Sequence, residues 1–211
     1  MSNFKISIVS SLIILLSLFC QNSFAHFTKQ ENINDNPGNL TSSYFVPKME
    51  SPSLVVLLHG CAQIGEELAE QSGLLGLAKK HQFALLMPQQ SLGNNIKRCF
   101  NWYSADDYAR NSGENLSIKN MIMSLKQQLG SKSVYIIGLS GGGAMASNML
   151  VNYPELFNAG AVVAGIPFPC AEDLITAISC MKNGPSQTAN ELTLKVDNIN
   201  PHHTQWPKMS V

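Results

Sequence analysis

The segment of this chain best suited to chemistry is a serine between glycines, Gly138-Leu-Ser140-Gly-Gly142. An apolar run at 134–137 precedes it and a run of small residues follows it, which predicts a strand, a tight turn and a helix. In such a turn the serine adopts strained backbone angles and its hydroxyl points out of the sheet. The N-terminus of the following helix stabilises negative charge at the same place. The pattern therefore predicts Ser140 as the nucleophile of an acyl-transfer reaction.

Two other interpretations of this segment are available. A glycine-rich turn between a strand and a helix also occurs where a serine does no more than cap the helix. A phosphate-binding loop is disfavoured, because no Gly-Lys-Ser/Thr follows the glycines and no GxGxxG pattern is present.

A second segment, His59-Gly60-Cys61, follows an apolar run at 54–58. Loops at the ends of neighbouring parallel strands lie close together, so we expect this loop beside Ser140. The backbone N–H groups of Cys61 and Gly141 would then form a two-donor oxyanion hole. His59 is a candidate general base, but its place directly after the strand favours a structural role in shaping the loop.

These groups must be positioned by strands and helices, which the pattern of apolar residues predicts. It predicts strands at 54–58, 83–87, 134–137 and 159–164, the second of them stopped by Pro88, and an edge strand at 44–46. It predicts helices at 66–81, 116–129, 142–153 and 170–181. The polar segment 89–112, with several aromatic residues, is expected to be a long functional loop. Strands that are apolar on both faces and alternate with helices indicate an α/β fold with a mostly parallel sheet flanked by helices.

The first 25 residues have the pattern of a secretory signal peptide, with Lys5 before an apolar run at 6–19 and cleavage expected before His26. A membrane anchor is the alternative, but the run is shorter than the roughly 20 residues that span a bilayer. A lipoprotein site at Cys20 is disfavoured by the bulky Phe19 before it. We therefore expect a secreted or periplasmic protein with no membrane anchor, in which 26–53 is a flexible lead-in and 54–211 is the α/β domain.

Composition excludes several classes of protein. The chain has 211 residues, 14 basic and 14 acidic side chains and no basic cluster, so a nucleic-acid partner is not expected. Its 45% hydrophobic content excludes a disordered chain. No pattern for a metal or a cofactor is present, and nothing indicates an oligomeric state.

Four cysteines remain after the signal segment: Cys61, Cys99, Cys170 and Cys180. An even number in an exported chain favours disulfides, with three pairings open, and four buried free thiols are the alternative. A structural zinc site is disfavoured, because no CxxC pair occurs.

Taken together, five segments resemble the polyhydroxybutyrate depolymerase and feruloyl esterase group of exported α/β-hydrolases. They are Leu57-Leu-His-Gly-Cys61, Pro88-Gln-Gln-Ser91, Arg98-Cys-Phe-Asn-Trp102, Gly138-Leu-Ser-Gly-Gly-Gly-Ala-Met145 and Gly165-Ile-Pro-Phe-Pro-Cys170. The resemblance covers the chain from about residue 54 onward and implies an α/β-hydrolase fold. It implies a serine esterase that acts through an acyl-enzyme on polyhydroxyalkanoates or related esters, small or polymeric.

The same resemblance implies roles for particular residues. Ser140 would be the nucleophile, and Cys61 and Gly141 would donate their N–H groups to the oxyanion. Disulfides would join Cys61 to Cys99 and Cys170 to Cys180. The aromatic residues Phe100, Trp102 and Tyr103 would flank the site, where acyl groups could pack against them.

In this family an acid and a histidine follow the serine on later strands. Here the next strand is expected to begin near Trp206, so the C-terminal part of the sheet is expected to be missing. Asp197, His202 and His203 occur in the required order, but within a polar stretch that indicates a loop. A catalytically impaired fragment or a binding-only relative is therefore the alternative to an active esterase, and a peptidase of the same fold is a third, weaker hypothesis.

Overall fold

The computed structural model describes residues 27–211, and the predicted signal peptide lies outside the described residues. The described chain forms a seven-stranded sheet in the order β1-β2-β4-β3-β5-β6-β7. The strands are β1 (Thr28–Lys29), β2 (Thr41–Phe45), β3 (Leu54–Leu58), β4 (Ala84–Gln89), β5 (Val134–Leu139), β6 (Ala159–Val163) and β7 (Lys208–Ser210). Strands β4, β3, β5, β6 and β7 are parallel, and β1 and β2 are antiparallel additions. The predicted α/β fold with a mostly parallel sheet is confirmed.

Strand β3 lies at the centre and is buried on both faces, as its continuous apolar run predicts. Leu54, Val56 and Leu58 point to one face of the sheet, and Val55 and Leu57 point to the other. This alternation divides the core into two layers of side chains, one on each side of the sheet.

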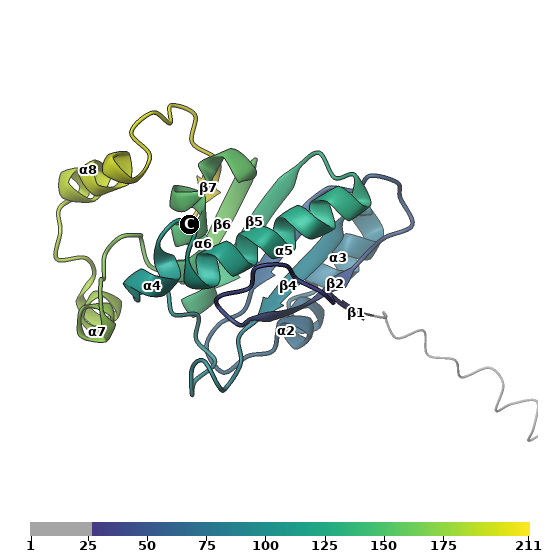
Figure 1. Ribbon diagram of the computed structural model, residues 1–211, viewed down its shortest axis with the longest axis horizontal. Helices are drawn as coiled ribbons and strands as arrows, with labels where there is room; N and C mark the ends of the chain where they lie inside the picture. The colour runs from purple at the N-terminus through teal and green to yellow at the C-terminus, as the bar shows by residue number, and fades with distance from the viewer. Residues whose placement is uncertain (1–26) are drawn as a thin grey trace, which may run out of the picture.

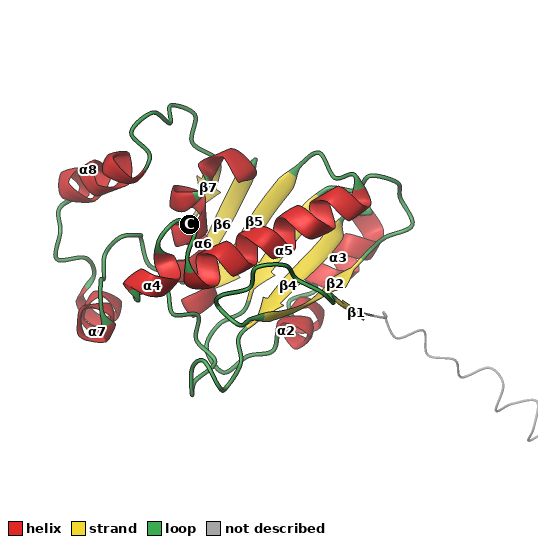
Figure 2. Ribbon diagram, in the orientation of Figure 1, coloured by secondary structure: helices red, strands yellow, loops and turns green. Residues whose placement is uncertain are grey.

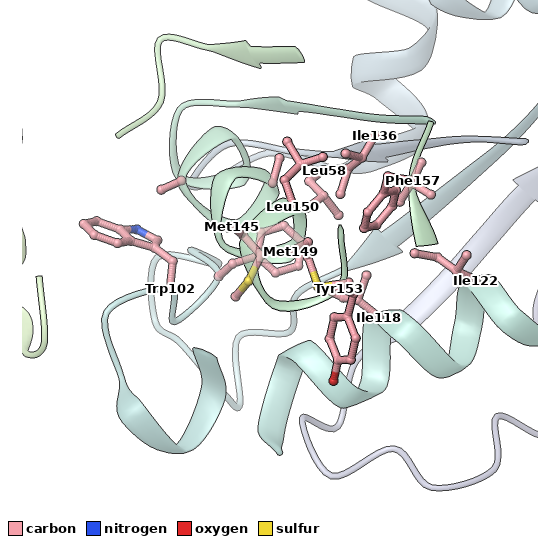
Figure 3. Close-up of a cluster of buried hydrophobic side chains, with 14 of the residues drawn as sticks. Leu58, Trp102, Ile118, Ile122, Ile136, Met145, Met149, Leu150, Tyr153 and Phe157 are labelled. Atoms are coloured by element: carbon pink, nitrogen blue, oxygen red, sulfur yellow. The ribbon is translucent and has the colours of Figure 1, made fainter. Parts of the chain in front are cut away.

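Helices cover both faces (Figures 1 and 2). Helices α5 (Gly113–Leu129) and α6 (Gly141–Asn152) pack on the face of Leu54, and α2 (Gly65–Gln71) and α3 (Leu74–His81) pack on the other. Figure 3 shows the first layer, in which side chains of α6 lie between the strands and α5; its labelled residues include Leu58, Ile136, Met145, Met149, Leu150, Ile118 and Ile122.

The helix predicted at 66–81 and the strand predicted at 83–87 differ from the structure. The single helix expected at 66–81 is two helices, because Gly73 adopts a left-handed φ of 76° between α2 and α3. Strand β4 does not stop at Pro88 but continues to Gln89. Proline is tolerated there because the ladder to β3 ends at Leu86, so no β3 carbonyl at Pro88 needs an N–H donor.

The lead-in segment 26–53 contains two strands where one edge strand is expected. β2 is an inner strand, since β1 pairs with its outer side and β4 with the other. The segment also packs against α5, where the N–H of Gly38 donates to the Ser117 hydroxyl at 2.8 Å. These pairings join residues far apart in sequence, which is why a local pattern does not reveal them.

The remaining elements are short helices outside the two layers that flank the sheet's centre. Helix α4 (Ala105–Tyr108) interrupts the predicted loop 89–112, and the short 3₁₀ helix η1 (Pro154–Leu156) follows α6. Helix α7 (Leu174–Asn183) begins later than the predicted residue 170, at the N-cap Asp173. Helix α8 (Ala189–Ile199) covers a segment for which no element was predicted, and it includes Asp197, which was expected to lie in a loop.

Within residues 27–211, none of the helices is long and apolar enough to cross a membrane. No group of three or more histidine, cysteine or carboxylate side chains in that range is placed to hold a metal ion.

Candidate active site

Ser140 occupies the sharp turn between β5 and α6. Its φ of 55° and ψ of −118° lie in a region that non-glycine residues rarely adopt, and the residue is exposed. The N–H of Ser140 donates to the carbonyl oxygen of Val163 at 2.9 Å, which anchors the turn to β6. Strained backbone of this kind is typical of functional sites. Here it exposes the serine at the carboxyl end of strand β5.

The flanking glycines are required by packing. A Cβ on Gly138 would collide with the carbonyl oxygen of Gly142, and a Cβ on Gly142 would lie 2.5 Å from the carbonyl oxygen of His59. The turn can therefore approach β3 this closely only without side chains at these two positions.

The loop after β3 brings Cys61 next to the start of α6. A Cβ built on Gly141 would lie 3.8 Å from the backbone nitrogen of Cys61, so the two residues are in direct contact. The N–H of Gly141 has no intrahelical partner because it opens the helix. Among the described residues, neither of these two N–H groups donates a backbone hydrogen bond. Both donors are thus available to an oxygen atom beside Ser140.

A cavity of about 540 Å³ opens at Ser140. Trp102 and Tyr103 form part of its wall, as the resemblance implies. Phe100 does not line it: this side chain is fully buried and packs against the His59 ring with centroids 4.8 Å apart. The rest of the wall comes from the segment 95–99, which adds the polar side chains of Asn95 and Lys97, from the loop after β6, and from α7 and the two residues that follow it. Its apolar members include Ala164, Ile166, Pro167, Leu174, Ala177 and Met181.

His59 is fully buried and both of its ring nitrogens are engaged. Nε2 accepts the N–H of Gln90 at 3.1 Å, so the ring proton lies on Nδ1, which donates to the carbonyl oxygen of Gly60 at 2.7 Å. Burial lowers the pKa of the imidazole, which keeps it neutral. The ring therefore shapes the loop, as the sequence favours, and cannot reach Ser140 as a base.

The cysteines lie in the two pairs that the resemblance implies. Cys61 and Cys99 are bonded with their Cα atoms 4.2 Å apart. The bond joins the loop after β3, here called the oxyanion loop (59–63), to the segment 89–112, here called the aromatic loop. Cys170 and Cys180 are bonded with Cα atoms 6.5 Å apart, across the start of α7. The alternative of four free thiols is excluded by this arrangement.

Glu114 is a site residue that the sequence did not reveal. It lies in the first turn of α5, is 1% exposed, and accepts hydrogen bonds from Gln90 and Asn101. Burial raises the pKa of its carboxyl group to about 8, and the Asp107 carboxylate nearby adds to the rise. An acidic residue at a helix start is ordinary in sequence, so only the distant partners identify this one.

Among the described residues that line the cavity there is no histidine, aspartate or glutamate. Asp197 lies exposed on α8. His202 and His203 follow that helix, and Nε2 of His203 interacts with the carbonyl oxygen of Gln205 at 2.6 Å while its ring packs on Trp206. The structure does not bring these three residues to Ser140.

Comparison with known proteins gives consistent matches. The family model described as Esterase PHB depolymerase matches residues 42–200. The chain is 38% identical to poly(3-hydroxyalkanoate) depolymerase C of Paucimonas lemoignei over 83% of this chain and 43% of that protein. It is 29% identical to feruloyl esterase B of Talaromyces stipitatus over 95% of this chain and 59% of that one. The chain thus spans about half the length of these curated relatives.

Solved structures show the same fold at low sequence identity. An acetyl xylan esterase from Aspergillus awamori superposes with a TM-score of 0.78 at 23% identity, covering 87% of this chain and 70% of that one. LpqC, a poly(3-hydroxybutyrate) depolymerase from Bordetella parapertussis, gives a TM-score of 0.55 at 15% identity, covering 80% of this chain and 62% of that one. The sheet and its flanking helices therefore have the same fold as these two structures.

Proposed function

This chain belongs to the esterase PHB depolymerase family, and from that premise we propose that it hydrolyses carboxylic esters with Ser140 as the nucleophile. The observation that carries the proposal is the turn at Ser140. An exposed serine with a φ of 55° stands at the mouth of a largely apolar cavity, beside the N–H groups of Cys61 and Gly141.

The reaction follows from this geometry. The Ser140 oxygen forms a bond to the ester carbonyl carbon, and the carbonyl oxygen becomes an oxyanion that the two N–H groups stabilise. The bond to the alkoxy oxygen then breaks, the alcohol leaves with a proton, and an acyl group stays on Ser140. Water attacks this acyl-enzyme and releases the acid.

The proton of the Ser140 hydroxyl needs an acceptor. Among the described residues that line the cavity, none is a histidine or carries a carboxylate. Without such a group, this step falls to water or to a buffer base, so acylation is slow. Oxyanion stabilisation without a base still leaves roughly 10³- to 10⁴-fold acceleration over water in comparable serine hydrolases.

The cavity suggests the substrate class. Its wall combines Trp102, Tyr103 and aliphatic side chains, and its volume of about 540 Å³ accommodates a short aliphatic or an aromatic acyl group. Relatives are named for poly(3-hydroxyalkanoate), feruloyl and acetylxylan substrates. We infer an ester of a short-chain hydroxyalkanoic or aromatic acid as the substrate, as a small molecule or as part of a polymer.

We expect slow hydrolysis of p-nitrophenyl butyrate that a small diffusible base accelerates. Imidazole at millimolar concentrations can enter the cavity and accept the Ser140 proton, so the protein-dependent rate should rise at least about tenfold. Release of p-nitrophenolate, corrected for imidazole alone, measures this rate.

The Ser140→Ala variant should show no protein-dependent rate with or without imidazole, and Ser124→Ala, an exposed serine on α5, should behave as the parent chain. A parent rate equal to that of Ser140→Ala under both conditions would refute the esterase. It would favour the second candidate, a binding-only relative, which the lack of a histidine or carboxylate in the described cavity wall supports.

We also propose that the protein functions outside the cytoplasm. The two disulfides support this location, because such bonds persist in oxidising compartments. The predicted signal segment at 1–25 points the same way. Reporter export with this segment, compared with a form lacking it, tests the location.

A further inference from the structure

The side chain of Glu114 joins two parts of the molecule that are separate in sequence. Its Oε2 accepts the backbone N–H of Asn101 at 2.8 Å, and its Oε1 accepts the Asn101 side-chain amide at 2.8 Å and the Gln90 side-chain amide. Three N–H donors thus converge on one buried acidic group at the start of α5. Together they hold both ends of the loop between residues 90 and 101.

From Gln90 a first path leads to the oxyanion loop. The backbone N–H of Gln90 donates to Nε2 of His59 at 3.1 Å, and Nδ1 of His59 donates to the carbonyl oxygen of Gly60 at 2.7 Å. Gly60 directly precedes Cys61. The position of the Cys61 N–H therefore depends on a ring that Gln90 orients.

A second path reaches the same residue from the other side. The Gln90 side-chain amide also donates to the carbonyl oxygen of Cys99 at 3.2 Å, and Cys99 is bonded to Cys61. Asn101 is followed directly by Trp102 and Tyr103, which line the cavity. One carboxylate thus supports both the loop that carries the Cys61 N–H and part of the cavity wall.

We propose that Glu114 is a positioning residue that holds the Cys61 N–H in place to stabilise the oxyanion at Ser140. The group does not touch the cavity, so it acts through Gln90, Asn101 and the Cys61–Cys99 bond. The inference rests on the proposed esterase function, since it assigns a role within that same site.

The Glu114→Gln variant tests it. Glutamine has the same shape, but its amide nitrogen replaces one acceptor and faces an N–H donor, so the loop cannot keep its hydrogen bonds. We expect kcat for p-nitrophenyl butyrate, measured with imidazole, to fall roughly 10- to 100-fold, because a small misplacement of a catalytic group has effects of this order. KM should change less than about twofold, since the lost interaction forms only in the transition state.

Amide hydrogen exchange followed by mass spectrometry gives a readout that is independent of turnover. Exchange in the peptides covering 59–63 and 90–101 should accelerate in Glu114→Gln, while peptides of β5 and α6 should exchange as in the parent chain. Glu67→Gln, at an exposed position on α2, is the matched control and should leave both kinetics and exchange unchanged.

The outcomes separate this inference from the proposed function. Unchanged kcat in Glu114→Gln, or a raised KM at constant kcat, overturns the positioning role while the esterase stands. A parent chain without Ser140-dependent turnover refutes the esterase, and unchanged exchange at 59–63 then overturns the positioning of the loop as well. If Glu114→Gln unfolds throughout, Asn101→Ala, which removes one of the three donors, is judged by the same criteria.

Discussion

Replacing Gly142 with alanine is expected to cost at least about 3 kcal/mol of the free energy of unfolding, at the upper end of overpacking effects. The added Cβ would lie 2.5 Å from the carbonyl oxygen of His59 and closer still to that of Leu58. Both obstacles are backbone atoms at the end of the central strand β3, so neither can rotate away. The start of α6 must move outward, which also withdraws Ser140 from the Cys61 N–H.

Urea unfolding of the variant measures this loss, and Gly76→Ala is its matched control. A Cβ on Gly76, in α3, meets no atom within 4 Å, so alanine there should stabilise the protein by about 0.5–1 kcal/mol through its helix propensity. A Gly142→Ala variant within about 1 kcal/mol of the parent would show that α6 does not press against β3 as described.

Removing the Cys61–Cys99 bond by a double substitution with serine is expected to have the second large effect. The bond closes 38 residues, and the chain-entropy relation gives about 4 kcal/mol for a loop of this length. Serine keeps the backbone N–H at position 61, but without the bond the loop that carries this proposed oxyanion donor is free to move. We therefore also expect the Ser140-dependent rate to fall roughly 100-fold or more.

The Cys170–Cys180 bond provides the comparison within the same chain. It closes only 10 residues, for which the same relation gives about 3 kcal/mol. Its loss should lower the melting temperature but affect the rate less, because neither cysteine offers an N–H to the oxyanion. Equal rate losses in the two double variants, at a temperature where both remain folded, would contradict the special role of the first bond.

The local sequence pattern was sufficient to predict those elements whose structure depends on neighbouring residues in the chain. The apolar runs predict β3 and β5 almost to the residue, and the glycines predict the turn at Ser140. Helix α8 was not predicted, although the sequence contains a signal for its start. Thr188 and Glu191 form a capping box in the structure, and a threonine followed three residues later by a glutamate is the sequence pattern typical of that motif.

Other features depend on contacts between distant segments and were beyond reach of the sequence. Pro88 fits within β4 only because β3 no longer pairs there. The importance of Glu114 depends on Gln90 and Asn101, which lie 24 and 13 residues away along the chain. The exclusion of Phe100 from the cavity depends on its packing against His59.

The most direct test of the account is to identify the residue that a serine-directed fluorophosphonate modifies, by tryptic mass spectrometry of the chain in the presence of imidazole. The account predicts a single adduct on the peptide that contains Ser140, absent from Ser140→Ala and retained in Ser124→Ala. Modification of another residue, or no modification while the protein is folded, would contradict a nucleophilic hydroxyl at this turn.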